Sequence, residues 1–294
     1  MRHYYLKGHL CALGAAVLFG LMSPMCKFAM QNKGVDALQL AFFRVCGAAI
    51  LFWLISLLIP REKIAGRDWL PLLGMSLCGM LINQFLYVLG IQYTSPGNAC
   101  VIGTSTPVMT FILSVLFLRQ RVTWGRTCGF LLAFAGAAVL IQGSGGDLSG
   151  HPLGDTLCLI SQLAAACYFV FFGRVLRRYH PITVMKWLFL MATLLSLIPM
   201  WHSLSSLEPE QFHLHELFAI TYIVVGGSFF SYLLLIVAQR RLAPPSVAAY
   251  NYVQPVIAVA TGVFLNLDLL TGQKLLSFLL IAAGVVLVSS RDKS

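Results

Sequence analysis

Long apolar stretches recur along the whole chain, and they constrain its fold more than any other feature. A transmembrane helix needs about 20 predominantly apolar residues. Stretches that meet this requirement lie near residues 9–30, 37–59, 69–91, 97–118, 125–142, 153–175, 181–201, 217–238, 245–265 and 272–290. They predict an all-α polytopic membrane protein with ten transmembrane helices. Because the first stretch is long enough to span and no A-x-A cleavage site ends it, we interpret it as a span and not as a signal peptide.

Composition excludes the soluble classes that might otherwise fit a basic chain. Of the 294 residues, 59% are hydrophobic and 10% are charged, whereas an ordinary soluble domain is about 25% charged. The net charge of +10 comes from short basic clusters between apolar stretches, so we expect a lipid bilayer and not nucleic acid as the partner. The eight cysteines form no CxxC pair and mostly fall in apolar stretches. They predict neither a disulfide framework nor a metal site, and no cofactor is expected.

Lysine and arginine are divided unequally between the two ends of the expected spans. The termini and alternate loops carry 15 of these residues, and the other loops carry 2. The remaining three, Lys27, Arg44 and Lys186, lie within spans. Basic residues concentrate in cytoplasmic loops, so both termini are predicted to be cytoplasmic. We expect a multi-pass protein of the cell membrane, meaning a bacterial plasma or inner membrane.

The second half of the chain repeats the first at an offset of 148 residues. The pairs that carry most weight are Gly79 with Gly227, Pro96 with Pro244, Pro107 with Pro255, and Gly136 with Gly284. We therefore predict a five-helix repeat over 1–143, an external linker over 144–152 and a second five-helix repeat over 153–294. Since five is odd, the second repeat enters the membrane inverted. Inverted repeats are a recurring plan of secondary transporters, with a substrate site near the midplane between the halves.

Several segments also resemble a known family. They are TSPGNACVIGTSTPVMTFILSVLFLRQRVT before a Gly/Ala-rich fifth span, LAPPSVAAYNYVQPVIAVATGVFLNLDLLT in the second half, GAAVLFGLMSPMCKFAM in the first helix and LQLAFFRVCGAAILF in the second. Over nearly its whole length the chain resembles the EamA-type permeases of the drug/metabolite transporter superfamily, with Lys27 and Arg44 at that family's basic positions. It departs at Gln120, where the family usually has an acidic residue, while Asp268 stands in the second half. The resemblance implies a ten-helix fold around a central cavity and metabolite transport, usually export, with no particular substrate.

Polar and aromatic side chains at the expected midplane are the candidate substrate-binding residues. They are Asn83, Tyr87, Thr104 and Thr106 in the first half, and Gln162, Tyr168, Asn251 and Gln254 in the second. The alternative is that they form interhelical hydrogen bonds without touching a substrate. Pro107 and Pro255 each fall roughly ten residues into a span and remove a helix hydrogen bond there. They are candidate hinges, with an ordinary kink as the alternative.

Arg44 is the most informative charged residue within the spans. It lies about eight residues into the second span, counted from the outside. A charge at that depth costs a few kcal/mol unless it is paired or hydrated. Arg44 is therefore a candidate site for a substrate carboxylate. The alternatives are that it pairs with helix-end carbonyls or extends its side chain outward to the interface.

The acidic residues and histidines all fall in expected loops or at span ends. Proton-driven carriers usually keep such a group inside the membrane, so we favour facilitated diffusion over proton antiport. No catalytic or metal-binding motif is present, and the longest loop is about 15 residues. The sequence thus predicts a secondary transporter of small metabolites, amino acids or related amphipathic solutes, exported by alternating access. An intramembrane enzyme and a receptor or scaffold are the alternatives.

Overall fold

The computed structural model describes residues 2–29, 35–94, 102–120, 122–143, 151–205, 214–264 and 271–289, and every regular element in these ranges is helical. The first half contains α1 (Arg2–Ala29), α2 (Ala37–Ser56), η1 (Gly66–Asp68), α3 (Trp69–Ser76), η2 (Leu77–Ile82), α4 (Asn83–Tyr93), α6 (Thr106–Leu118) and α7 (Trp124–Gly143). The second contains α8 (Pro152–Phe171), α9 (Gly173–Arg178), α10 (Pro181–Ser205), α11 (Leu214–Val224), η4 (Val225–Phe230), α12 (Ser231–Gln239), α13 (Pro244–Ala249), η5 (Tyr250–Tyr252), α14 (Val253–Phe264) and α15 (Gly272–Ser289).

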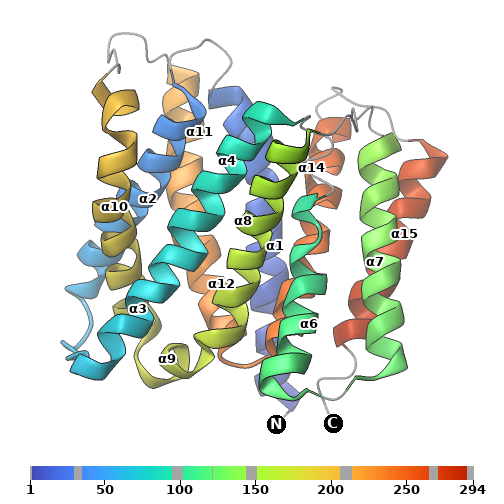
Figure 1. The fold of residues 1–294 in the computed structure, drawn as a ribbon, viewed down its shortest axis with the longest axis horizontal. Helices are drawn as coiled ribbons and strands as arrows, with labels where there is room; N and C mark the ends of the chain where they lie inside the picture. The colour runs from blue at the N-terminus through green and yellow to red at the C-terminus, as the bar shows by residue number, and fades with distance from the viewer. Residues whose placement is uncertain are drawn as a thin grey trace.

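The helices stand side by side and roughly parallel to one another in one bundle (Figure 1). The first helices of the two halves, α1 and α8, lie in the middle. The second helices, α2 and α10, pack on each other toward one edge, and the fifth helices, α7 and α15, pack on each other at the opposite edge. Helix α1 begins and α15 ends at the same end of the bundle, as an even number of crossings requires (Figure 1).

The long apolar helices have the dimensions of membrane spans. Six described stretches are long and apolar enough to cross a bilayer: 5–22, 38–56, 66–87, 152–171, 181–198 and 216–239. Three shorter apolar helices accompany them, over 106–118, 124–140 and 272–288. The stretch expected as a single span near 245–265 is divided among α13, η5 and α14. The chain is therefore an all-α multi-pass membrane protein.

Two irregular segments occupy equivalent places in the two halves. The third helix of each half contains a π-helical segment, η2 over 77–82 and η4 over 225–230. The offset between them is the same 148 residues that relates the halves in sequence. A π segment inserts one residue into the helix and is frequently found at functional sites. Its recurrence at matching positions means that both halves share the local backbone as well as the order of helices.

The fourth helix of each half is broken before its proline. In the first half a turn at residues 104–105 precedes α6, where Pro107 is the second residue. In the second half the 3-10 segment η5 precedes α14, where Pro255 is the third residue. Each proline lies in the first turn of a new helix, so the span is interrupted just before the proline. Proline fits that position, since first-turn N–H groups have no partner within the helix.

Helices from different halves approach most closely at glycines. The Tyr168 ring of α8 covers Gly79 of η2 so closely that a methyl group on Gly79 would lie 2.6 Å from a ring atom. At the equivalent place Met22 of α1 covers Gly227 of η4, 3.0 Å from a methyl placed there. Helices α7 and α15 cross with the carbonyl oxygen of Gly129 only 2.5 Å from a methyl placed on Gly284. Small residues allow the backbones of membrane helices to approach this closely.

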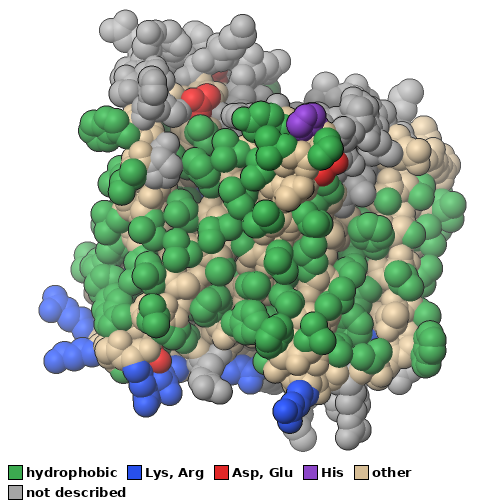
Figure 2. All heavy atoms as spheres, in the orientation of Figure 1, with side chains coloured by type: hydrophobic (Ala, Val, Ile, Leu, Met, Phe, Trp, Pro, Cys, Tyr) green, Lys and Arg blue, Asp and Glu red, His purple; other side chains and the backbone are tan. Residues whose placement is uncertain are grey.

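One end of the bundle is basic, as the distribution of Lys and Arg predicts. Figure 2 shows the Lys and Arg side chains of the visible face at the end where α1 begins. Three segments meet there: Arg178 at the end of α9 donates a hydrogen bond of 2.6 Å to Asp68 before α3, and Arg240 after α12 donates one of 3.4 Å to the carbonyl oxygen of Arg177. The basic loops that the sequence assigns to one side therefore lie together.

The crossing of α7 and α15 yields a stability prediction. Gly284→Ala would place a methyl group against backbone atoms of Gly129 and Ala133, and we expect a loss of about 1–3 kcal/mol of stability from overpacking. Gly272→Ala is the matched control, because nothing lies within 4 Å of a methyl at Gly272. Thermal unfolding of the two purified variants checks this. Equal melting temperatures would contradict the close crossing.

Candidate functional site

Arg44 is buried at the contact between the two halves. Its side chain is 8% exposed, and its Nε donates a hydrogen bond of 3.0 Å to the hydroxyl oxygen of Ser228 in η4. The Ser228 hydroxyl in turn donates to the carbonyl oxygen of Ile223, 2.9 Å away and five residues back near the end of α11. Arg44 is thus held between helices, and its side chain does not extend outward to the interface.

Aromatic rings and not carboxylates surround the Arg44 guanidinium. Its Cζ lies 6.0 Å from the centre of the Phe19 ring and 5.9 Å from that of Tyr232, where the ring faces attract a cation. Within the described ranges no carboxylate forms an ion pair with Arg44, and its two terminal nitrogens donate to no described acceptor. The positive charge therefore remains without an anionic partner among these residues.

The acidic side chains, His9 and Lys186 lie in loops, at the start of helices or next to aromatic rings in the described residues. The described carboxylates, Asp36, Glu62, Asp68, Asp155 and Glu216, all lie in loops or at the start of helices.

His9 differs from the expectation, because it lies within the apolar stretch 5–22 of α1, where its Nδ1 is 3.0 Å from the Tyr250 hydroxyl. Lys186 lies over the Trp53 ring, 4.9 Å from its centre. The side chain of Lys27 lies outside the described residues. No group of three or more His, Cys, Asp or Glu side chains in the described part is arranged for a metal ion.

Four of the predicted binding residues lie where α4 and the region before α6 pack on α8. The Asn83 amide donates to the Ser161 carbonyl oxygen at 3.0 Å, and the Ser161 hydroxyl donates back to the Asn83 carbonyl oxygen at 2.8 Å. The Thr106 hydroxyl hydrogen-bonds to Oε1 of Gln162. Tyr87 lies near this group, since its hydroxyl is 3.6 Å from a methyl placed on Gly103. These hydrogen bonds link helices of the two halves, which is the packing role that was the alternative to substrate binding. Thr104, two residues before Thr106, is also buried.

The remaining predicted residues lie apart from that group. The buried Tyr168 donates through its hydroxyl to Oε1 of Gln239 at 3.3 Å, toward the basic end. The Gln254 amide donates to Oδ1 of Asn251 at 3.1 Å, within one turn of the second half's broken helix. The structure therefore places the predicted residues in separate hydrogen-bonded groups, and not around one pocket.

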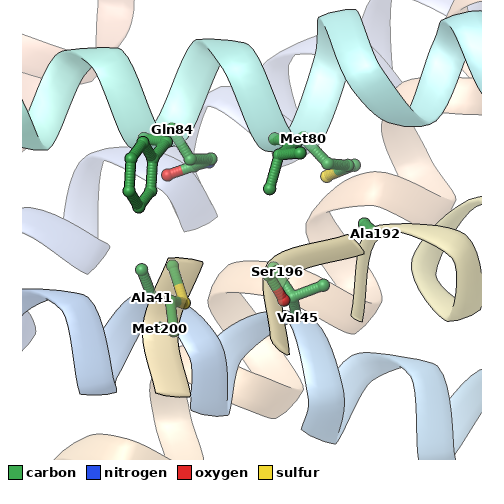
Figure 3. Close-up of a pocket in the computed structure, with 9 residues that line it drawn as sticks. Ala41, Val45, Met80, Gln84, Ala192, Ser196 and Met200 are labelled. Atoms are coloured by element: carbon green, nitrogen blue, oxygen red, sulfur yellow. The ribbon is translucent and has the colours of Figure 1, made fainter. Parts of the chain in front are cut away.

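A narrow pocket opens instead between α2, α10 and the third span of the first half (Figure 3). Gln84 and Met80 point from one helix toward Ala41, Ser196 and Met200 on the facing helices. Nine residues line it: Ala41, Val45, Met80, Leu81, Gln84, Phe85, Ala192, Ser196 and Met200. The start of α2 and the end of α10 place this pocket in the half of the bundle away from the basic end.

The pocket and the Arg44 site occupy equivalent positions in the two halves. At the 148-residue offset, Ala192, Met80 and Gln84 of the pocket correspond to Arg44, Ser228 and Tyr232. Ala41 and Met200 correspond to Phe189 and Phe52 in the same way. Small and flexible side chains leave a space on one side, whereas an arginine and large aromatic rings occupy that space on the other.

Aromatic packing closes the side that holds Arg44. The Phe52 ring lies 5.3 Å from Phe189 and 4.5 Å from Phe229, centre to centre, and Phe189 meets Tyr232 edge-on at 5.2 Å. All four residues are at most 7% exposed. Aromatic rings therefore fill the position that a small pocket occupies in the other half.

Comparison with known proteins also finds two repeated halves, which together span nearly the whole chain. A match to the EamA-like transporter family covers residues 6–142 and again residues 152–290. The chain belongs to the EamA-like transporter family. It is a membrane transporter, as the resemblance of its motifs implied.

Two of the similar proteins are transporters by name. An uncharacterized transporter of Archaeoglobus fulgidus is 26% identical over 92% of this chain and 94% of its own length. The uncharacterized inner membrane transporter YedA of Escherichia coli (strain K12) is 28% identical over 86% of this chain and 81% of its own. A WAT1-related protein of Arabidopsis thaliana is 24% identical over 94% and 83%. A solved crystal structure matches 100% of this chain and 98% of its own with a TM-score of 0.82 and 16% identity, which shows the shared fold.

Some residues of the site were missing from the sequence-based candidates. Gln84 was placed on the correct span but Asn83, its neighbour, was chosen, because a polar residue in a span does not reveal which way it points. Ser228 and Phe19 have side chains too common in membrane helices to attract notice. The alignment of the halves holds the one useful signal, since it pairs Arg44 with Ala192 and so marks a charge that only one half carries.

Two asparagines offer a matched test of binding against packing. Asn83 is hydrogen-bonded to another helix, whereas the side chain of Asn251 bonds only within its own segment. Asn83→Ala is expected to lower stability by about 0.6 kcal/mol for each lost hydrogen bond. Asn251→Ala is expected to keep the melting temperature and lower the transport rate. Both quantities are measured on the same purified variants, and a wild-type rate in stable Asn251→Ala would remove Asn251 from the substrate path.

Proposed function

We propose that this protein is a secondary transporter that exports amino acids or related amphipathic solutes by alternating access. In this proposal ten helices cross the membrane as two inverted five-helix repeats, over 1–143 and 153–294, joined by the external linker 144–152. Six long spans, three shorter apolar helices and the broken helix α13–η5–α14 are the observed elements that correspond to those ten crossings. The linker lies mostly outside the described residues.

The observation that carries this proposal is the different filling of two equivalent positions. A small pocket lies beside Gln84, whereas aromatic rings fill its counterpart around Tyr232. In an inverted repeat each half can adopt the conformation of the other. Exchange of the two conformations would close the pocket and open its counterpart. That exchange moves a solute from one side of the membrane to the other.

Contacts at the basic end hold the observed conformation closed there. Asp68, at the start of the third span, accepts hydrogen bonds of 2.6 Å from both Arg178 and the Tyr179 hydroxyl of the other half. The Asp68 carboxylate raises the pKa of Arg178 through this bond. The backbone N–H of His180 also donates to Glu62 at 2.8 Å. We infer that these contacts separate when the basic end opens.

The irregular segments are the proposed hinges. The π-helical segments η2 and η4 lie beside the pocket and beside Arg44, and the breaks before Pro107 and Pro255 lie in the neighbouring helices. Backbone at these points has already departed from regular α-helix, so it can change its dihedral angles without breaking a continuous hydrogen-bond ladder.

Transport in proteoliposomes tests the function and its energy source. We expect labelled phenylalanine or leucine to exchange down its gradient without an imposed pH gradient, because the described carboxylates lie in loops or in the first turn of their helices. His9 is the group that could overturn this, since it lies within the first span. Accumulation driven by a pH gradient alone, lost in His9→Gln, would show proton coupling through His9. Absence of exchange for a broad set of amino acids and their derivatives would contradict the proposed function.

Orientation in the membrane is a separate prediction. Reporter fusions at residues 64, 122, 177 and the C-terminus should read as cytoplasmic, because basic loops remain on that side. Fusions at residues 147 and 208 should read as external. A cytoplasmic signal at residue 147 would overturn the ten-span arrangement and the inversion of the second half.

A further inference from the structure

We propose that Arg44 makes this transporter selective for univalent organic anions, and that the membrane potential drives their export. This inference rests on the proposed function and names its substrate class and driving force. It starts from the buried guanidinium, which has no carboxylate partner among the described residues and reaches from α2 to Ser228 of η4, Phe19 of α1 and Tyr232 of α12.

The Arg44 contacts leave two nitrogens of the guanidinium without an acceptor in the described part of the chain. Its Nε is held by the Ser228 hydroxyl at 3.0 Å, and Ser228 is itself fixed by its bond to Ile223. The two terminal nitrogens have no described acceptor. They form the planar pair of donors that binds a carboxylate through two parallel hydrogen bonds. Ser228 therefore orients the guanidinium as well as contacting it.

The residues around Arg44 indicate the rest of the ligand. Phe19 and Tyr232 meet edge-on with ring centres 5.2 Å apart beside the guanidinium, and Phe189 packs on Tyr232. These apolar surfaces suit an aromatic or aliphatic body attached to the carboxylate. A small inorganic anion would leave them uncovered.

Charge balance distinguishes an anion from a zwitterion at this site. The ammonium group of a free amino acid would need a negatively charged partner, and the described neighbours of Arg44 are the Ser228 hydroxyl, the Cys26 thiol and aromatic rings. A second positive charge close to the guanidinium is also disfavoured by Coulomb repulsion. A solute that neutralises Arg44 therefore carries a net charge of −1, as an amino acid does when its amino group is acylated.

The direction of transport follows from this charge. Arg44 is fixed to α2 and stays with the protein, so each cycle moves one negative charge with the solute. A cell interior is negative, so this movement is favoured outward. A potential of about 60 mV balances a roughly tenfold concentration ratio of a univalent anion. No proton relay is needed for such export.

Proteoliposomes with a potential set by potassium and valinomycin test this inference. The probes are N-acetylphenylalanine, phenylalanine and N-acetylphenylalanine amide, which share one aromatic body and differ in charge. We expect the acetylated anion to accumulate about tenfold at roughly 60 mV, inside positive, and phenylalanine to show no response to potential. Uptake of the anion that is independent of potential would overturn the inference. So would chloride alone carrying the same potential-driven flux through Arg44.

Variants separate this inference from the proposed function. Arg44→Gln should lower anion uptake at least about tenfold with little change in melting temperature, and Arg44→Lys should keep part of it, because lysine supplies the charge without the paired donors. Lys186→Gln is the control for loss of a half-buried positive charge over aromatic rings, and it should leave uptake unchanged. If phenylalanine is transported equally by wild type and Arg44→Gln, the transporter proposal stands and the anion inference fails. If none of the three probes is transported, both fail.

Discussion

Packing of the first helix of each half against the third helix of the other holds this bundle together. Lipid is as apolar as the helix surfaces, so membrane helices associate through close van der Waals contact and interhelical hydrogen bonds, with little hydrophobic driving force. Gly79 under Tyr168 and Gly227 under Met22 provide that contact at two equivalent places. Both glycines lie in π-helical segments, and Ser228 of one such segment holds Arg44. The arrangement that joins the halves is thus the same arrangement that positions the candidate site.

The features predictable from the sequence are those that the membrane itself enforces. Apolar length, the distribution of basic residues and the 148-residue offset each report a requirement repeated many times along the chain, so single exceptions do not obscure them. The π-helical segments left no such signal, because the extra residue depends on how η2 and η4 pack against helices from the other half. Pro107 was correctly recognised as an irregularity, but its place in the first turn of α6 depends on the turn before it.

The candidate site was less predictable, because it depends on side-chain direction. Asn83 and Gln84 are neighbours on one span, yet Asn83 bonds to Ser161 while Gln84 lines the pocket. A rotation of about 100° per residue separates their directions, and the sequence does not fix the rotation of a helix that is apolar on all sides. The same limitation applied to His9, whose position at a predicted span end gave no hint of its contact with Tyr250.

Positions at which the two halves carry different residues determine where an inverted repeat has a charge that can act on a solute. Positions that agree between the halves, such as Gly79 and Gly227, determine how the helices pack and leave the two sides interchangeable. Arg44 and Ala192 disagree, so the charge is present in only one of the two equivalent places. If the halves exchange conformations, the environment of Arg44 changes from packed against Phe19 and Tyr232 to open, while Ala192 contributes no charge in either state. A solute held by Arg44 would then be released or captured as that environment opens and closes, and its charge would decide how the membrane potential acts on each step.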